Sequence, residues 1–316
     1  MRAIFFGTPQ LAVPSLEAVH DVAEIVQVIC QPDRPAGRGM KLRPPPVKER
    51  ALALGLEVTQ PKKVRTAEFA ASLRALEADV AVVIAYGRIL PQAVLDAPRR
   101  GCVNVHASLL PKLRGAGPIN RAIVEGHAET GVCLMQMDAG MDTGPVITCA
   151  ATPIGVDENA AELGTRLADM GAELLRAHLA EWVDGSLEVT PQDHDAATLA
   201  PLLKKEDGRI DWSLPAQRVH DLVRGMFPWP GAFTTIDGEV LKVHRTRLHD
   251  ASGQLGAPGQ VLSGNGLAGD GLVVACGQGA VAVERLQLQG KKKLDARDFL
   301  AGRPIAPGAL LGEKTT

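Results

Sequence analysis

The sequence lacks the segments that carry a chain to or across a membrane. The first strand-like run, from Arg2 to Phe6, begins without the basic and apolar regions of a signal peptide. No apolar stretch reaches the roughly 20 residues that are needed to span a bilayer. We therefore expect a soluble, cytoplasmic protein that has no membrane partner.

Motifs for metal binding are also missing. The 8 histidines show no HxxxH or HExxH spacing and the 5 cysteines form no CxxC pair, so we expect no bound metal. The cysteines lie apart, mostly in apolar runs, which favours buried free thiols in a reducing compartment. These cysteines are Cys30, Cys102, Cys133, Cys149 and Cys276.

Two signatures of common enzyme classes are absent as well. The first strand ends in Gly7-Thr8-Pro9, without the GxGxxG spacing that lets a backbone approach a pyrophosphate. An enzyme that uses a nicotinamide or flavin dinucleotide is therefore not expected. Ser108 lacks the GxSxG pattern of a nucleophile elbow, and no cysteine is placed to replace it, so we expect no covalent enzyme intermediate.

Short apolar, β-branched runs alternate with helix-like segments in the first part of the chain. Strands that alternate with helices predict a Rossmann-like α/β domain, in which helices cover both faces of a mostly parallel sheet. Leucines and a methionine at positions 163, 167, 170 and 174 predict a long helix over residues 157–182 that closes this domain. Ligands of such sheets bind beyond the carboxyl ends of the strands. The expected strands are residues 3–7, 24–30, 80–85, 102–106 and 132–137.

The residue composition and the pattern of expected strands change after residue 190, which indicates a second domain. Residues 190–203 contain proline, aspartate and alanine and are predicted to be a linker between a first domain at 1–189 and a second at 204–316. Short strands between glycine and aspartate turns predict a small, OB-like β-barrel in the second domain. Its expected strands are residues 232–236, 240–244, 259–262, 272–275 and 280–286.

The net charge of −2 does not by itself indicate a polyanionic partner, but the charges are unevenly distributed. Residues 204–316 carry 15 Lys and Arg against 12 Asp and Glu, whereas residues 1–203 carry 19 against 24. A separate basic stretch runs from Arg34 to Arg65. Two basic regions on one chain keep a nucleic acid in consideration as a partner.

The end of one predicted strand gives the first candidate site. Side chains alternate along a strand, so Asn104 and His106 project from the same face and Val105 from the other. An amide donor and an imidazole therefore lie side by side at a carboxyl end. A lone histidine is most often an ordinary core or surface residue. The neighbouring Asn104 and the apolar, proline-bounded loop that follows favour a functional role for His106.

The segment 135–144, MQMDAGMDTG, gives the second candidate site, at a place where a strand stops and the chain turns around Asp142. An aspartate between glycines usually forms a turn. A carboxylate on such a turn can also approach an imidazole from the neighbouring strand. There it keeps the imidazole protonated and fixes its orientation.

The chain resembles the formyltransferases that use 10-formyltetrahydrofolate. The string NVHASLLPKLRGAGPI and the later MDAGMDTG are similar to a signature of the glycinamide ribonucleotide and methionyl-tRNA formyltransferases. The segments QPDRPAGRGMKLRPPPVK and LLKKEDGRIDWS, at 31–48 and 202–213, resemble the methionyl-tRNA branch in particular. The resemblance covers essentially the whole chain and implies a formyltransferase domain followed by a tRNA-binding domain.

Carried over to this sequence, the resemblance implies that Asn104, His106 and Asp142 are the catalytic residues. It also implies that the loop after His106 contacts the folate, and that the segment from Tyr86 to Leu90 lines the same pteridine pocket through its backbone. The expected folate contacts are Ser108, Leu109, Leu110, Pro111, Ile89 and Leu90. The resemblance further places Arg38 against the tRNA acceptor end.

Formyl transfer to an amine passes through a tetrahedral intermediate whose oxygen gains negative charge. The Asn104 amide and a protonated His106 can both donate to that oxygen. Asp142 keeps His106 cationic and moves a proton from the attacking amine to the departing folate nitrogen. Because an α-amine needs little activation, positioning and oxyanion stabilisation are expected to dominate.

Basic residues are expected to hold the tRNA. The glycine- and proline-rich segment after the second strand carries Arg38, Lys41 and Arg43, and can grip acceptor-stem phosphates. Lys204 and Lys205 can contact phosphates from the second domain, as OB-type folds do. We therefore expect the substrates to be initiator methionyl-tRNA and 10-formyltetrahydrofolate. We also expect the protein to be a monomer.

Three other functions remain open at this point. The same catalytic residues could formylate a small amine such as glycinamide ribonucleotide, which does not require a basic second domain. Water in place of the amine would give a folate-dependent hydrolase. A catalytically silent RNA-binding protein could share the fold, but Asn104, His106 and Asp142 all being present argues against it.

Overall fold

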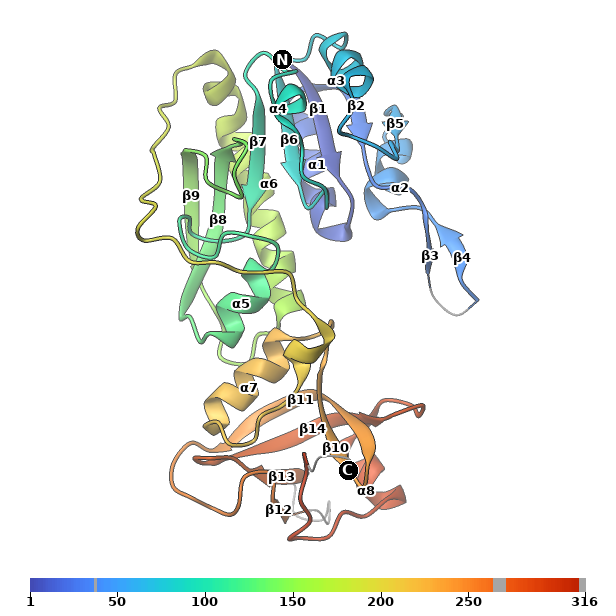
Figure 1. The fold of residues 1–316 in the computed structure, drawn as a ribbon, viewed down its shortest axis with the longest axis vertical. Coiled ribbons are helices and arrows are strands. Elements are labelled where there is room, and N and C mark those ends of the chain that lie inside the picture. The colour runs from blue at the N-terminus through green and yellow to red at the C-terminus, as the bar shows by residue number, and fades with distance from the viewer. Residues whose placement is uncertain (37–38, 264–270, 313–316) are drawn as a thin grey trace. The chain divides into compact units, whose positions relative to one another are not determined.

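The computed structural model describes residues 1–36, 39–263 and 271–312 (Figure 1). The chain divides into two compact units. Unit 1 consists of residues 1–118, 130–152 and 164–200, and unit 2 of residues 119–129, 153–163 and 201–316. The domain limits expected from the sequence, at 189/190 and 203/204, remain predictions.

Unit 1 is built on a sheet of the order β5-β2-β1-β6-β7-β8-β9. The pairs from β5 to β7 are parallel, and β8 runs antiparallel to β7. The prediction of a mostly parallel sheet is therefore confirmed. The strands are β1 (Arg2–Gly7), β2 (Glu24–Ile29), β5 (Val58–Thr59), β6 (Val80–Ile84), β7 (Cys102–His106), β8 (Glu129–Gln136) and β9 (Val146–Pro153).

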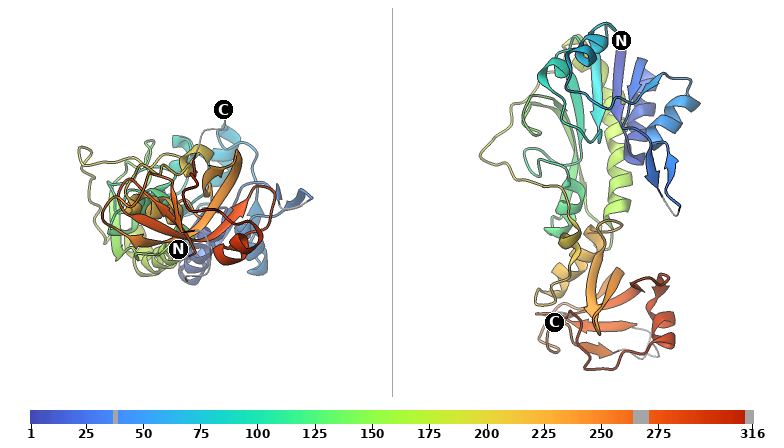
Figure 2. Two further views of the ribbon diagram at one scale, coloured as in Figure 1. Left: turned by 90° about the horizontal axis from the view of Figure 1, so that it is seen from below. Right: turned by 45° about the vertical axis from the view of Figure 1, so that its right-hand side comes forward.

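Helices cover both faces of this sheet, because each of its central strands is apolar on both sides. Residues of α3 and α4 share one hydrophobic core with β1, β6 and Cys102 of β7. The long helix α6 lies on the other face (Figure 2), where Gly171 allows close contact with Val105. The helices that lie wholly or mainly in unit 1 are α1 (Val13–Val22), α2 (Pro46–Ala53), α3 (Ala67–Arg74), α4 (Gln92–Leu95) and the expected long helix α6 (Ala160–Asp184), with a 3₁₀ turn η1 (Gln10–Ala12).

A hairpin of β3 (Arg34–Ala36) and β4 (Lys41–Arg43) extends from the segment that follows β2. Its strands are antiparallel and pair Arg34 with Arg43. The side chains of β4 are all exposed. This hairpin is the structure that the glycine- and proline-rich basic segment adopts.

Unit 2 contains a curled antiparallel sheet of the order β10-β11-β14-β13-β12, with β15 paired to β14. The sheet forms a half-barrel, which confirms the predicted OB-like domain. Its core is closed by Trp212, by Val219 and Val223 of α7 and by Phe299 of α8. The remaining elements are α5 (Pro118–Val124), η2 (Lys205–Gly208), α7 (Ala216–Gly225), β10 (Ala232–Ile236), β11 (Glu239–Asp250), β12 (Val261–Ser263), β13 (Leu272–Ala275), β14 (Ala280–Leu288), β15 (Leu294–Asp295) and α8 (Ala296–Gly302).

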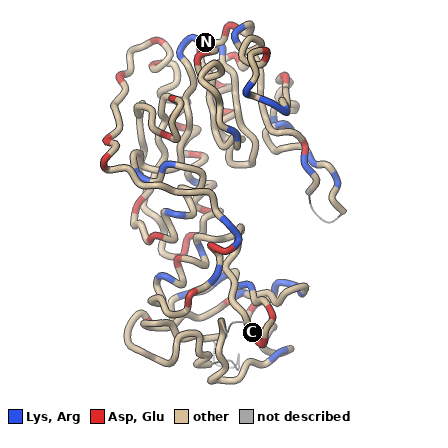
Figure 3. The backbone as a smooth tube through the Cα atoms, viewed as in Figure 1, with Lys and Arg blue, Asp and Glu red and all other residues tan. Residues whose placement is uncertain are grey.

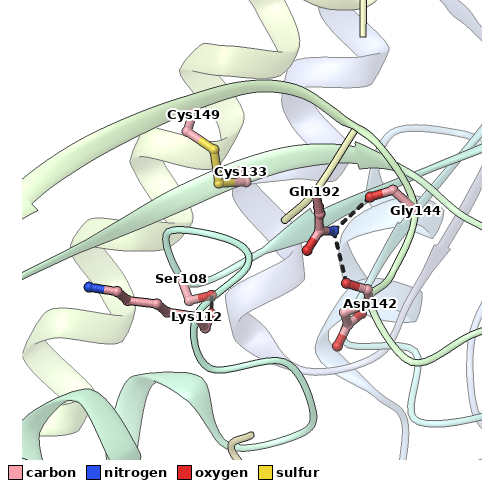
Figure 4. The surroundings of a disulfide bond; sticks show 7 residues. All are labelled: Ser108, Lys112, Cys133, Asp142, Gly144, Cys149 and Gln192. Atoms are coloured by element: carbon pink, nitrogen blue, oxygen red, sulfur yellow. Dashed lines mark hydrogen bonds between the residues drawn. A yellow bond between two sulfur atoms is a disulfide. The ribbon is translucent and has the colours of Figure 1, made fainter. Parts of the chain in front are cut away.

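The expectation of five free thiols is wrong for one pair. Cys133 of β8 and Cys149 of β9 form a disulfide (Figure 4). The reason is that β8 and β9 are neighbours in the sheet, which brings the two Cα atoms to 4.1 Å although 16 residues separate them in the sequence. Cys30, Cys102 and Cys276 are buried free thiols, as expected.

Residues 1–36, 39–263 and 271–312 contain neither a membrane-spanning helix nor a metal-binding group. No helix in these ranges combines the length and apolar character that a bilayer crossing requires. No group of three or more His, Cys, Asp or Glu side chains in them is arranged to hold a metal ion.

Candidate active site

Two neighbouring strands bring the three predicted catalytic residues together. Asn104 and His106 lie on one face of β7 at its carboxyl end. Strand β8 pairs antiparallel with β7, so the turn that follows β8 returns to this end of the sheet. Asp142 lies on that turn, and its carboxylate is the point at which the three side chains meet.

The Asp142 carboxylate has a partner on each oxygen. Oδ1 accepts a hydrogen bond from Asn104 Nδ2 at 3.3 Å, and Oδ2 accepts one from the backbone N–H of Gly115 at 2.8 Å. Oδ2 also lies 3.6 Å from Nδ1 of His106, at ion-pair distance. The amide, the imidazole and the carboxylate therefore converge, as the sequence argument requires.

The surroundings of the His106 ring determine where its protons lie. The side chain is only 5% exposed, and its Nε2 lies 3.1 Å from the carbonyl oxygen of Leu113. Because a carbonyl oxygen only accepts, Nε2 must carry a proton. Nδ1 faces the Asp142 carboxylate, so a second proton there gives an imidazolium that is a donor on both sides.

The turn that carries Asp142 is held by a buried glutamine. Asp142 has a positive φ of 54°, a conformation that needs support from its surroundings. Gln192 Nε2 donates to the carbonyl oxygens of Asp142 and Gly144, at 2.9 and 2.6 Å (Figure 4). Arg114 in turn donates from Nε and Nη2 to Gln192 Oε1, at 3.0 and 2.7 Å. Gln192 and Arg114 therefore position Asp142.

Sequence reasoning did not find Gln192, Arg114 or Gly115. Gln192 lies in the stretch predicted to be a linker, yet Thr190 pairs with Val146 and residues up to 200 belong to unit 1. The partners of Gln192 lie 48, 50 and 78 residues away in the sequence. No local motif signals a contact over such distances.

Replacing Gln192 with alanine is expected to lower the free energy of unfolding by about 1–3 kcal/mol, because two backbone carbonyls and the Arg114 guanidinium lose a buried partner. Denaturant unfolding of the variant and the wild type measures the difference. Asp195→Ala, an exposed change three residues away, should stay within about 0.5 kcal/mol. Equal losses in both variants would contradict the positioning role.

The residues expected to contact folate occupy two loops beside β7. Ser108 is fully buried and donates from Oγ to the carbonyl oxygen of Lys112 at 2.6 Å, so its side chain shapes its own loop. Leu109 packs against Gly131 of β8, and the bond from Leu110 to Pro111 is cis. In the second loop, the side chain of Ile89 is 71% exposed, whereas Leu90 lies in the core.

A cavity of about 570 Å³ opens beside the second of these loops, where Tyr86 and Gly87 line it. Its walls come from the segments that follow β1, β2 and β6 and from prolines that precede and begin α2. Since β6 pairs with β7, the cavity lies at the carboxyl edge of the sheet, next to the strand of Asn104. Gln31, Arg34, Arg43 and Tyr86 are among the residues that line it.

The basic residues singled out from the sequence lie on the surface. Lys41 and Arg43 are exposed on β4, and Lys204 and Lys205 are exposed at the start of η2. Arg38 lies outside the described residues.

The chemistry available at this site is that of a charged, partly buried oxyanion site. Asn104 and His106 offer donors on one side of a reacting carbonyl, and the carboxylate of Asp142 offers a proton acceptor. These donors and this acceptor can catalyse an acyl transfer without forming a covalent bond to the substrate. The arrangement contains the parts for transfer of a small acyl group to an amine.

Two family models match the chain. Residues 1–179 match the family described as formyl transferase, and residues 202–304 match the formyl transferase C-terminal domain. The N-formyltransferase of Helicobacter canadensis, solved with folinic acid and dTDP-3-aminofucose, has a similar fold with a TM-score of 0.66 at 19% identity, over 89% of this chain and 98% of that one.

Curated relatives are similar along their full length. A methionyl-tRNA formyltransferase of Sorangium cellulosum is 57% identical over 314 residues, which cover 99% of this chain and 100% of that protein. One of Myxococcus xanthus is 48% identical over 308 residues, which cover 98% and 97%. The chain therefore belongs to the formyl transferase family, among the methionyl-tRNA formyltransferases.

Proposed function

We propose that this protein transfers the formyl group of 10-formyltetrahydrofolate to the α-amine of initiator methionyl-tRNA, acting as a monomer in the cytoplasm. The observation that carries the proposal is the convergence of Asn104, His106 and Asp142 at the carboxyl end of β7. Membership of the methionyl-tRNA formyltransferases supports the choice of donor and acceptor.

The reaction begins when the amine attacks the formyl carbon. As the carbonyl oxygen becomes negative, Asn104 Nδ2 donates a hydrogen bond to it. The second donor is the Nδ1–H of the protonated His106 ring, because Nε2 is engaged with the Leu113 carbonyl whereas Nδ1 lies 3.6 Å from the Asp142 carboxylate. Asp142 takes the proton that the amine loses, directly or through a water, and that proton passes to N10 of the folate as the bond from carbon to N10 breaks. The products are formylmethionyl-tRNA and tetrahydrofolate.

The two loops beside β7 bind the folate. Ile89 offers an exposed apolar side chain, whereas buried Leu90 offers only its backbone. The hydrogen bond within the loop from Ser108 to Lys112 holds Leu109, Leu110 and Pro111 in a fixed conformation. A preformed loop of this kind lowers the entropy cost of binding a flat ring.

The cavity beside β1, β2 and β6 receives the aminoacylated end of the tRNA. Its walls are rich in proline, and Arg34 and Arg43 add positive charge. The hydrogen bond from Gln31 Nε2 to the carbonyl oxygen of Tyr86, at 3.1 Å, fixes the segment between this cavity and the folate loop. Donor and acceptor thus approach the catalytic residues from neighbouring strands.

The hairpin of β3 and β4 contacts tRNA phosphates. Arg34 and Arg43 are register partners, which is an unfavourable pairing of like charges. Figure 3 shows basic residues on both strands of the hairpin. Among the described residues, Arg34, Lys41 and Arg43 form no ion pair. Bound anions such as phosphates would reduce the electrostatic repulsion among these cations. Lys204 and Lys205 of unit 2 make further phosphate contacts.

Lys41→Ala and Arg43→Ala are each expected to weaken tRNA binding and to reduce the slope of log K against log salt concentration by about 1, because each removes one phosphate contact. Binding titrations at several salt concentrations measure both quantities. The control is Arg50→Ala, since Arg50 Nε already pairs with Glu17 at 2.6 Å. If the control lowers the slope as much as the hairpin variants, the assignment of the hairpin is wrong.

Acceptor choice is tested with the purified protein and 10-formyltetrahydrofolate. We expect the donor to be consumed only when charged initiator tRNA is supplied. Equal transfer to glycinamide ribonucleotide, or hydrolysis without an acceptor, would overturn the substrate assignment. Binding of tRNA without any turnover would instead support the silent RNA-binding alternative.

A further inference from the structure

The two cysteines of the disulfide differ in their access to solvent. Cys133 lies in the central part of β8 and is fully buried, whereas Cys149 lies on the edge strand β9 and is exposed. An exposed cysteine bonded to a buried one is accessible to an external thiol from one side only. An external thiol can therefore attack the disulfide at the sulfur of Cys149.

The disulfide is next to the catalytic residues. Cys133 is the register partner of His106 in the pairing of β7 with β8, so both side chains lie on the same face of the sheet. Gly131, two residues before Cys133 on that face, contacts the side chain of Leu109 from the folate loop. The disulfide thus lies among elements that position the substrates.

The disulfide also closes a ring of chain that contains Asp142. The bond joins positions 133 and 149, and the turn with Asp142 lies between them. The other contacts that hold Asp142 are not covalent: hydrogen bonds from Gly115, Asn104 and Gln192 and the ion pair with His106. A covalent link between β8 and β9 reduces the conformations that the turn between these strands can adopt.

We propose that Cys133 and Cys149 are a reversible redox pair that controls the position of Asp142, so that the disulfide form transfers formyl groups faster than the dithiol form. The proposal rests on the proposed function. Disulfides are rare in a reducing cytoplasm, and those that occur there are mostly transient and catalytic or redox-sensing. This disulfide joins the two strands that flank the turn of Asp142, so a change in its redox state can alter the position of that turn.

The exchange partner is a low-molecular-weight disulfide and its thiol. The Cys149 thiolate attacks one sulfur of the external disulfide and releases one thiol. Cys133 then attacks the mixed disulfide at Cys149 and releases the second thiol. The two cysteines lose two electrons and two protons in total, and the external disulfide gains them. Excess thiol reverses both steps.

The other three cysteines do not interfere with a measurement of this pair. Burial raises the pKa of Cys30 to about 11 and the pKa values of Cys102 and Cys276 to about 12. Their thiolate fractions near neutral pH are therefore very small, and thiolates are the reactive species. Alkylation of the folded protein should report on Cys133 and Cys149, with Cys149 reacting first.

The test equilibrates the full chain in buffers of increasing ratio of reduced to oxidised glutathione. Alkylation and mass spectrometry measure the dithiol fraction, and assays with methionyl-tRNA measure kcat. We expect kcat to fall about tenfold with the same midpoint as the dithiol fraction rises, because Asp142 is less well placed. Hydrogen exchange of residues 137–145 should become faster over the same range.

Two variants serve as controls. Cys149→Ser should have the activity of the dithiol form at every ratio, whereas Cys276→Ala, in unit 2, should keep the full redox response. The proposal is overturned if the pair stays a disulfide, or stays a dithiol, at every glutathione ratio. It is also overturned if the pair is fully reduced while the hydrogen-exchange rates of residues 137–145 stay constant. If neither form transfers formyl groups, the proposed function fails, and the exchange rates alone then decide whether the pair controls the turn.

Discussion

Replacing His106 with alanine is expected to lower kcat for formyl transfer about 100- to 1000-fold, because the tetrahedral intermediate loses one of its two side-chain donors. The loss should appear in kcat rather than in KM, since the donor is used mainly when charge develops on the oxygen. Rapid-quench measurements of formylmethionyl-tRNA under saturating substrates test this expectation.

The matched control for this prediction is His178→Ala, on the surface of α6. His178 Nδ1 lies 3.1 Å from a carboxylate oxygen of Glu181, so this change also removes an imidazole that has an acidic neighbour. We expect its kcat to stay within about twofold of wild type, as for most surface changes. Binding of tRNA by His106→Ala should remain at the wild-type level, and a large drop in affinity would mean that the variant is misfolded.

The strands and the placement of Asn104 beside His106 could be predicted because their signals are local. The run 102–106 was expected as a strand and is β7 at the same limits. Alternation along a strand then places Asn104 and His106 on one face, whatever the rest of the chain does. The same local reasoning gave residues 232–236 and 272–275, which are β10 and β13.

The support of the site could not be predicted, because it depends on tertiary contacts. Asp142 was expected near His106, but the fold alone determines that Gln192 and Arg114 hold its turn. The disulfide has the same origin. Cys149 becomes the neighbour of Cys133 only because β9 folds back along β8, and no spacing of the five cysteines indicates that pairing.

The loop contacts show a further limit of sequence reasoning. The expected folate contact of Ser108 stays a prediction, and the structure shows that its hydroxyl donates to the Lys112 carbonyl while its side chain is fully buried. Ile89 and Leu90 are adjacent in the sequence, but one is exposed and the other belongs to the core. A motif identifies such a loop, whereas packing decides which of its atoms are accessible to a ligand.

The Asp142→Asn variant is expected to lose about 1000-fold in kcat. The change keeps the size of the side chain but removes the charge that faces His106 Nδ1 at 3.6 Å, and it removes the acceptor of the amine proton. Loss of general-base catalysis alone typically costs about 100- to 10000-fold. The new amide NH₂ is a donor, so it cannot accept the hydrogen bonds that Asn104 and Gly115 donate to the carboxylate oxygens in the wild type. Single-turnover formylation with saturating donor measures the chemical step directly.

Asp138→Asn, in the same turn, separates this chemistry from turn formation. The Asp138 carboxylate accepts hydrogen bonds from the backbone N–H of Gly140 and from Thr143 Oγ1, and it is exposed. The asparagine can still accept both bonds, so the turn should persist and kcat should change by less than about threefold. Equal damage from the two substitutions would show that the turn needs its negative charge for folding only. A loss confined to Asp142→Asn, with unchanged tRNA affinity, ties the charge at this one position to movement of the amine proton.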